Sequence, residues 1–268
     1  MKALQGLAFC LISVFSFSGA HAQRITPFFP NLKIGAPLLD WVTDSTNSMI
    51  ATPSLDNIIP LNRNKFGPGF NTSALIIPLT GIAYGVAAFN DGAIRTLNIS
   101  TRNEIQQHNA SFSSSLDDYL QWSPAVAVIG LNAAGIRGRN SFGNELLIYG
   151  VSTTLMAGTV YSLKHCINER RPDGSNAQSF PSGHTATAFA AAEWLRTEYH
   201  DRSPWIGVAG YLAATATGVL RMFNNRHWIS DVVSGAAVGF LCTRAAYCIT
   251  PWIKRKVLRK SAKQPIGF

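Results

Sequence analysis

The sequence predicts an all-helical protein whose core is a bundle of six helices. From residue 74 onward, apolar stretches rich in Ala, Gly, Val and Leu recur, without the sustained apolar–polar alternation typical of half-buried strands. Most are apolar over more than half of the helical circumference, as expected for helices buried in a bundle or a membrane. The stretches cover residues 74–89, 122–135, 146–163, 184–195, 205–220 and 229–249.

The chain begins with the pattern of a secretory signal, which we assign to residues 1–22. Lys2 forms a short basic region, residues 7–17 an apolar core, and residues 20–22 a small-x-small cleavage site. An uncleaved anchor helix is the alternative, although the apolar run is short for a membrane span. Residues 23–70 are polar and rich in Pro, Asn and Ser, so we expect an irregular segment.

Residues near the expected helix starts agree with this division. Ser123, Ser182 and Ser203 are suited to N-cap positions, and Pro204 fits the first turn of a helix. The linker at residues 90–118 carries charges and amides and is compatible with an amphipathic helix. The sequence therefore separates a polar N-terminal part from a helical domain.

We expect the helical domain to span residues 71–253 and a basic tail to follow at residues 254–268. Six of the net nine positive charges lie in this tail, which contains no acid. It can be a solvated end, a cytoplasmic anchor or a contact with anionic lipid. No nucleic-acid-binding motif accompanies the charge, so we expect no nucleic-acid partner, and no obligate protein partner is evident.

The apolar stretches suit a membrane or a soluble bundle, and we favour membrane association. Residues 146–163, 205–220 and 229–249 approach the length of a membrane span. However, the mean hydropathy is only +0.10. Glu193 and Arg244 also lie within apolar stretches, where a lipid-facing charge would be costly.

A polar stretch between the last two apolar stretches holds Arg221, His227 and Asp231. On a helix, His227 and Asp231 would lie on one face, about one turn apart. A carboxylate there can hold the proton on one imidazole nitrogen and leave the other as a nucleophile or base. Arg221 offers a planar fork suited to phosphate. Alone, this stretch is more simply interpreted as a helix start with a surface His–Asp pair.

Two further clusters lie upstream. Lys164 closes an apolar stretch, and Arg171 follows seven residues later, so the two cations can converge on one anion. Ser182 and Gly183 open the next stretch, where free backbone N–H groups and the helix dipole suit a phosphate oxygen. His184 in the first turn would point into the same site. Each cluster alone could be a basic flank or an ordinary helix cap.

Together, the order and spacing of these clusters resemble the three-part signature of the type 2 phosphatidic acid phosphatase (PAP2) and vanadium haloperoxidase superfamily. The resemblance covers residues 74–250 and includes every charged position of the signature. One departure is Leu220, where the family usually has Ser. The resemblance implies a PAP2-like six-helix bundle and a metal-independent phosphatase that needs no cofactor.

The resemblance also implies a role for each site residue. His227 would attack phosphorus and form a phosphohistidine, Asp231 would hold its tautomer, and His184 would protonate the leaving group and then activate water. The phosphate-binding residues would be Lys164, Arg171, Ser182, Gly183 and Arg221. We see no carboxylate cluster for a divalent ion in the sequence, and expect Glu169 and Asp173 to tune the cationic site instead.

An envelope lipid is the expected substrate, since an acyl chain could lie along apolar helices beside the cationic site. The family suggests phosphatidylglycerol phosphate, undecaprenyl diphosphate, phosphatidate or lipid A. A soluble periplasmic non-specific acid phosphatase is the main alternative. A vanadium-dependent haloperoxidase and a non-catalytic anion-binding membrane protein have less support.

We expect the protein in the cell envelope, exported across the inner membrane and associated with it, with the active site facing the periplasm. That orientation places basic loops at residues 137–139 and 196–202, and the basic tail, on the cytoplasmic side. With a cleaved signal it requires an odd number of spans, so not all six apolar stretches can cross.

Overall fold

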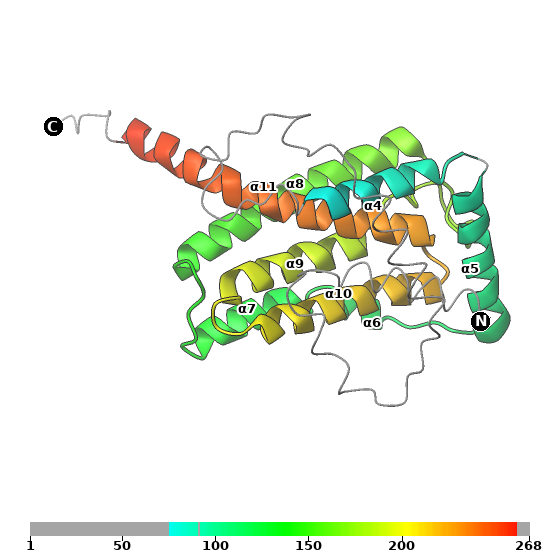
Figure 1. Cartoon of the computed structure of the whole chain (residues 1–268), viewed down its shortest axis with the longest axis horizontal. Coiled ribbons are helices and arrows are strands. Elements are labelled where there is room, and N and C mark those ends of the chain that lie inside the picture. Colours follow the sequence, from blue (N-terminus) through cyan, green and yellow to red (C-terminus); the bar gives the residue numbers. More distant parts are fainter. Residues whose placement is uncertain (1–74, 91, 262–268) are drawn as a thin grey trace, which may run out of the picture. The chain divides into compact units, whose positions relative to one another are not determined.

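The structure, a computed structural model, describes residues 75–90 and 92–261, and all of its regular elements there are helices. The predicted signal, the segment at residues 23–70 and the last seven residues of the tail lie outside the described residues. In chain order the described helices are α4 (Ile76–Ala87), α5 (Ala93–Asn109), α6 (Leu116–Leu120), α7 (Ser123–Ala133), α8 (Phe142–Ile167), α9 (Gly183–Tyr199), α10 (Pro204–Phe223) and α11 (Ile229–Ser261) (Figure 1).

The all-helical prediction is confirmed, and each predicted apolar stretch corresponds to one helix: α4, α7, α8, α9, α10 or α11. The linker adds α5 and the five-residue α6. Ser182 and Ser203 are N-caps, as predicted, but Ser123 is the first residue of α7 and Trp122 precedes it. The Ser123 hydroxyl instead donates to the carbonyl of Leu120, at the end of α6.

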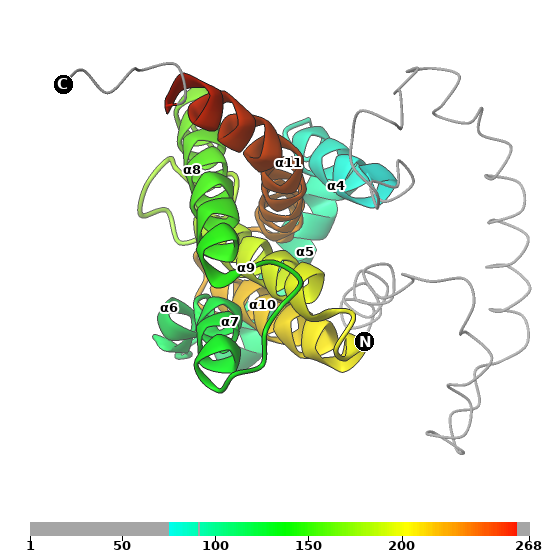
Figure 2. The same ribbon diagram turned by 90° about the vertical axis from the view of Figure 1, so that its left-hand side faces the viewer.

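Helix α9 is the central element, and α7, α8, α10 and α11 pack around it (Figure 2). Nearly all of its side chains are buried, and many are Ala, which lets neighbouring backbones approach closely. On α11, Gly235 and Gly239 face the start of α9. A Cβ atom at Gly235 would lie 2.5 Å from the carbonyl oxygen of Ser182, and one at Gly239 would clash with the carbonyl of Ala186.

The two charges found within apolar stretches pair inside the bundle. Glu193 on α9 is fully buried. Its carboxylate accepts hydrogen bonds from Arg196 at 2.7 Å and from the Tyr211 hydroxyl at 2.6 Å, and Arg244 of α11 lies 3.5 Å away. Because a buried charge is tolerated when it is paired, these residues fit an apolar setting without facing lipid.

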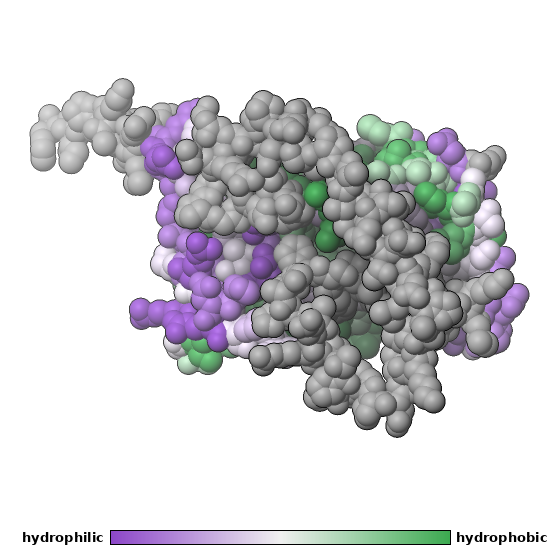
Figure 3. All heavy atoms as spheres, in the orientation of Figure 1, coloured by the Kyte–Doolittle hydropathy of each residue, from purple (hydrophilic) through white to green (hydrophobic). Residues whose placement is uncertain are grey.

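Three of the described helices are long and apolar enough to cross a membrane: α8, α10 and, within α11, residues Ile229–Lys256. Their outward faces carry exposed apolar side chains, among them Leu147, Leu155, Leu212 and Ile249. On the face shown in Figure 3, apolar side chains gather over α4 and the C-terminal half of α8. These features fit the predicted association with a membrane.

The two ends of the bundle carry different sets of residues. The C-terminal ends of α8 and α10 and the N-terminal ends of α9 and α11 meet at one end, at the right in Figure 1, where α5 and α6 also pack. Every predicted site residue lies at this end. The opposite end is hydrophilic, at the left in Figure 3, and its cations include Arg137, Arg139, Arg196 and Arg202.

Candidate active site

The third motif spans the connection between α10 and α11. Arg221 is in the last turn of α10 and Asp231 in the first turn of α11, but His227 precedes α11 rather than lying on it. The Nδ1 atom of His227 is 3.4 Å from Oδ2 of Asp231. The same oxygen accepts the Ser179 hydroxyl at 2.5 Å and the backbone N–H of Trp228 at 2.9 Å, so the carboxylate is held at the helix start.

Burial keeps His227 neutral. Its side chain is 2% exposed, and burial lowers its pKa to about 4. Asp231 opposes this shift, while the positive charges of Arg221 and Lys164 add to it. Since Nδ1 faces Asp231, the unprotonated Nε2 is the nitrogen available for attack at neutral pH.

The first motif brings two cations to the same end. Lys164 lies in the last turn of α8, and its Nζ donates a hydrogen bond to the carbonyl of Gln178 at 2.6 Å. The helix is followed by Asn168, a C-cap residue in the left-handed conformation. Arg171 follows in the connection to α9. Burial lowers the pKa of Arg171, and the nearby positive charge of Arg221 lowers it further.

These guanidinium groups keep free donors. Nε of Arg171 and Nε of Arg221 are buried and have no hydrogen-bond partner among the described residues. Buried donors are normally paired. A multivalent anion such as a phosphoryl group would satisfy both of them.

The second motif opens α9. Ser182 is the N-cap, and its side chain accepts a hydrogen bond from the backbone N–H of Thr185. The backbone N–H of Ser182 donates to the carbonyl of Asp231 at 3.0 Å, which joins the second motif to the third. A Cβ atom at Gly183 would meet only Val160, at 3.8 Å, so packing within the described residues does not require glycine there. Its small size fits close approach of a ligand instead.

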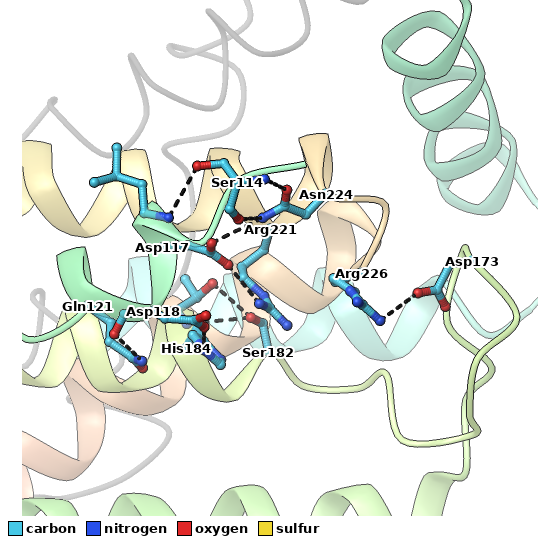
Figure 4. A network of polar contacts seen from close by, with 12 residues as sticks. Ser114, Asp117, Asp118, Gln121, Asp173, Ser182, His184, Arg221, Asn224 and Arg226 are labelled. Carbon is cyan, nitrogen blue, oxygen red and sulfur yellow. Dashed lines mark hydrogen bonds and ion pairs between the residues drawn. The ribbon is translucent and has the colours of Figure 1, made fainter. Parts of the chain in front are cut away.

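Sequence reasoning missed two acids on α6. Oδ1 of Asp118 is 2.8 Å from Nε2 of His184, and Oδ2 of Asp117 accepts a hydrogen bond from Arg221 at 2.7 Å (Figure 4). The acids lie 66 and 104 residues from these partners, so no local spacing pointed to them. Burial lowers the pKa of His184, Arg221 adds to this shift, and the two acids oppose it.

Asp117, Asp118 and His184 also place three possible metal-ligand atoms within 4.8 Å of one another, a cluster not evident in the sequence. Their contacts already account for the cluster. Each carboxylate oxygen of Asp117 accepts a hydrogen bond, one from Arg221 and one from the side-chain amide of Asn224, and Asp118 is paired with His184. The carboxylates thus balance the cationic site.

Glu169 and Asp173 lie beside the site, where the sequence placed them. The Glu169 side chain is 7% exposed, and burial, together with the nearby Asp231 carboxylate, raises its pKa well above the usual range, while Arg95, 3.9 Å away, opposes this shift. Asp173 forms an ion pair with Arg226 at 3.0 Å. Glu169 therefore adds a neutral carboxyl group beside Asp231, while Asp173 neutralises a cation at the rim.

The structure brings all eight predicted site residues to one end of the bundle. Arg221 is the common neighbour, because its charge lowers the pKa of both His227 and His184. Both histidines therefore lie close enough to Arg221 for its charge to act on them. Such an arrangement can bind a phosphoryl group and place one imidazole as a nucleophile and the other as an acid or base.

Comparisons with known proteins agree with this geometry. The family described as the PAP2 superfamily matches residues 145–255, which include all eight predicted site residues. The lipid A 1-phosphatase of Porphyromonas gingivalis is 41% identical over 190 residues, which is 70% of this chain and 41% of that protein. The chain thus spans less than half the length of this curated relative.

Two crystal structures are similar at low sequence identity. Aquifex aeolicus LpxE is 23% identical, with a TM-score of 0.40, and the match covers 54% of this chain and 92% of that one. A transmembrane PAP2-type phosphatidylglycerolphosphate phosphatase from Bacillus subtilis is 18% identical, with a TM-score of 0.47, over 68% of this chain and 97% of that one.

Proposed function

We propose that this chain is a metal-independent phosphatase that hydrolyses a phosphate ester or diphosphate of an envelope lipid, because residues 145–255 match the PAP2 superfamily. One observation carries the proposal: three cations from separate segments, Lys164, Arg171 and Arg221, interact with one another, and the charges of Lys164 and Arg221 reach the buried neutral His227. Charge spreads over the equatorial oxygens during phosphoryl transfer, and these cations would stabilise it together with the start of α9.

In the first half-reaction, Nε2 of His227 attacks phosphorus. The new P–N bond forms as the P–O bond to the leaving alkoxide breaks, and His184 gives its proton to that oxygen. Nδ1–H of His227 donates to Asp231, which stabilises the developing positive charge. The product of this step is a phosphohistidine and a free alcohol.

In the second half-reaction, water attacks the phosphohistidine. His184, now neutral, takes a proton from the water as its oxygen bonds to phosphorus. The P–N bond breaks, which regenerates His227 and releases inorganic phosphate. The same imidazole thus serves as acid and then as base.

A phosphate of lipid A is the substrate we rank first. The support is the 41% identity to a lipid A 1-phosphatase over 190 residues. Exposed apolar side chains on the helices that carry the site are compatible with a substrate held in a bilayer. Phosphatidylglycerol phosphate, undecaprenyl diphosphate and phosphatidate are the other candidates.

We also propose that the protein is exported to the cell envelope and that its site faces the periplasm. The signal pattern of residues 1–22 supports export. The cations at the end of the bundle opposite the site suit the cytoplasmic side of a membrane.

The direct test is phosphate release from a panel of these four lipids in detergent, with EDTA present, by the wild-type chain and by His227→Ala. We expect release by the wild type, with lipid A hydrolysed fastest, and no release by the variant. Activity of His227→Ala equal to the wild type would refute the nucleophile. Loss of wild-type activity in EDTA would refute the metal-independent mechanism.

A further inference from the structure

Helix α6 places a carboxylate against the histidine that we assign as general acid. Asp118 lies 2.8 Å from Nε2 of His184, at the first turn of α9 (Figure 4). The His184 side chain is 29% exposed and that of Asp118 is 56% exposed, so the pair sits at the open side of the site. Burial alone therefore does not fix the orientation of the imidazole.

The position of α6 is itself fixed by contacts of two residues that precede Asp118. Asp117 is 1% exposed and accepts a hydrogen bond from Arg221. Ser114 exchanges two hydrogen bonds with the side chain of Asn224, at 3.0 and 2.8 Å. Asp118 is thus held by a short helix that is anchored to the end of α10.

Building on the proposed function, we propose that Asp118 is a positioning residue for the general acid: its carboxylate holds Nε2 of His184 and leaves Nδ1 to face the leaving group. When the P–O bond breaks, the Nδ1 proton passes to the leaving oxygen. When water attacks, Nδ1 takes a proton back. The Nε2 proton stays hydrogen-bonded to Asp118 in both steps, so Asp118 is never protonated.

The role of Asp118 predicts the direction in which the pH dependence of kcat/KM should shift. The charged groups facing His184 are Arg221 from α10, which lowers its pKa, and Asp117 and Asp118 from α6, which raise it, while burial lowers it most. Removing the charge of Asp118 therefore lowers the His184 pKa further. Because the acid must be protonated, the alkaline limb of kcat/KM should move to lower pH.

The test compares Asp118→Asn with Asp201→Asn, a matched change of an exposed acid in the turn between α9 and α10. Each is assayed on an alkyl phosphate and on p-nitrophenyl phosphate, whose leaving group needs little protonation. For Asp118→Asn we expect kcat/KM on the alkyl phosphate to fall about 10- to 100-fold, less than loss of the acid itself. The fall on p-nitrophenyl phosphate should be much smaller, and the alkaline limb should shift to lower pH.

Retained activity on p-nitrophenyl phosphate shows that the variant is folded. In a His184→Ala background, Asp118→Asn should cause no further loss. Equal losses on both substrates with an unmoved pH limb, or behaviour equal to Asp201→Asn, would overturn the proposal. A lower KM with an unmoved limb would also overturn it, because the carboxylate would then compete with the substrate phosphate. If the wild-type chain hydrolysed neither substrate, the proposed function itself would be refuted.

Discussion

At the scale of single residues, the two histidines need opposite protonation states, and this makes the pH dependence testable. His227 must be neutral to attack, and burial lowers its pKa to about 4. His184 must be protonated to act as an acid, and its pKa is also lowered from the usual value near 6.5. As the pH rises, activity should therefore increase around pH 4, where His227 loses its proton. It should decrease again before the pH reaches neutrality, because His184 then loses its proton.

The measurement is kcat/KM against pH, which reports the ionisations of the free enzyme. His184→Ala should lose the alkaline limb and keep the acidic limb that His227 sets. The substrate phosphate also titrates near pH 6, so all variants must be compared on one substrate. An optimum above pH 8 would contradict the assigned protonation states.

Glu169 and Asp231 provide a second prediction. Replacing each carboxyl group by an amide should affect kcat/KM differently, although the two groups are neighbours. Burial and the Asp231 charge keep Glu169 protonated, so Glu169→Gln replaces one neutral group by another of similar shape. We expect kcat/KM within about threefold of the wild type. Asp231→Asn removes the charge that stabilises the His227 cation and should lose at least about 100-fold.

Both variants can be compared by phosphate release at the optimal pH, with thermal unfolding as a check on folding. A loss for Glu169→Gln as large as that for Asp231→Asn would show that Glu169 acts as a carboxylate. The prediction would then be wrong.

The sequence predicted the motif residues because the order and spacing of three clusters, two cations, a capping Ser-Gly pair and a His–Asp pair, together resemble one family signature, although each cluster alone has an ordinary interpretation. Asp117 and Asp118 could not be found this way. Their partners are 104 and 66 residues away, and the linker that bears them carries no pattern of its own. Only the packing of α6 against α9 and α10 gives them a role.

At the scale of helices, composition predicted the apolar stretches well because burial selects Ala, Gly, Val and Leu along a whole element. Periodicity could not show that α9 is enclosed by protein, since a lipid-facing helix and an enclosed helix are both apolar all round. It also placed His227 on a helix, whereas α11 begins two residues later, at Ile229. Helix ends depend on capping contacts such as the one from Trp228 to Asp231.

The contact of α11 with α9 yields a prediction at this scale. In Gly235→Ala, the new Cβ atom would lie 2.5 Å from the Ser182 carbonyl oxygen, a backbone atom that cannot rotate away. Helix α11 must shift, and Asp231 lies one turn earlier on it. We expect a loss of about 1–3 kcal/mol in unfolding free energy, as for other overpacked sites, together with a fall in kcat/KM.

Gly158→Ala on α8 is the matched control, since a Cβ atom there meets nothing within 4 Å. Alanine favours helix more than glycine, so the control should be neutral or slightly stabilising. Thermal unfolding in detergent and phosphate release measure the two effects. Equal behaviour of the two variants would show that α11 and α9 do not pack as closely as described.

At the scale of the whole described bundle, the polarity of its two ends leads to a proposed orientation. The site lies at one end, and Arg137, Arg139, Arg196 and Arg202 lie at the other. Basic loops are retained on the cytoplasmic side of a membrane. The sequence contained these charges, but whether they share one end depends on which helices run antiparallel, which the structure supplies.

A native cysteine allows this orientation to be measured with little change to the chain. Cys166 is exposed near the C-terminal end of α8, at the end of the bundle that holds the site, whereas Cys242 and Cys248 are half-buried on α11. In spheroplasts with a sealed inner membrane, a membrane-impermeant maleimide should label the wild type and not Cys166→Ser. The double variant Cys166→Ser/Arg137→Cys moves the thiol to the opposite end, so labelling should require permeabilisation. Labelling of the double variant from outside, with Cys166 protected, would reverse the orientation and place the site in the cytoplasm.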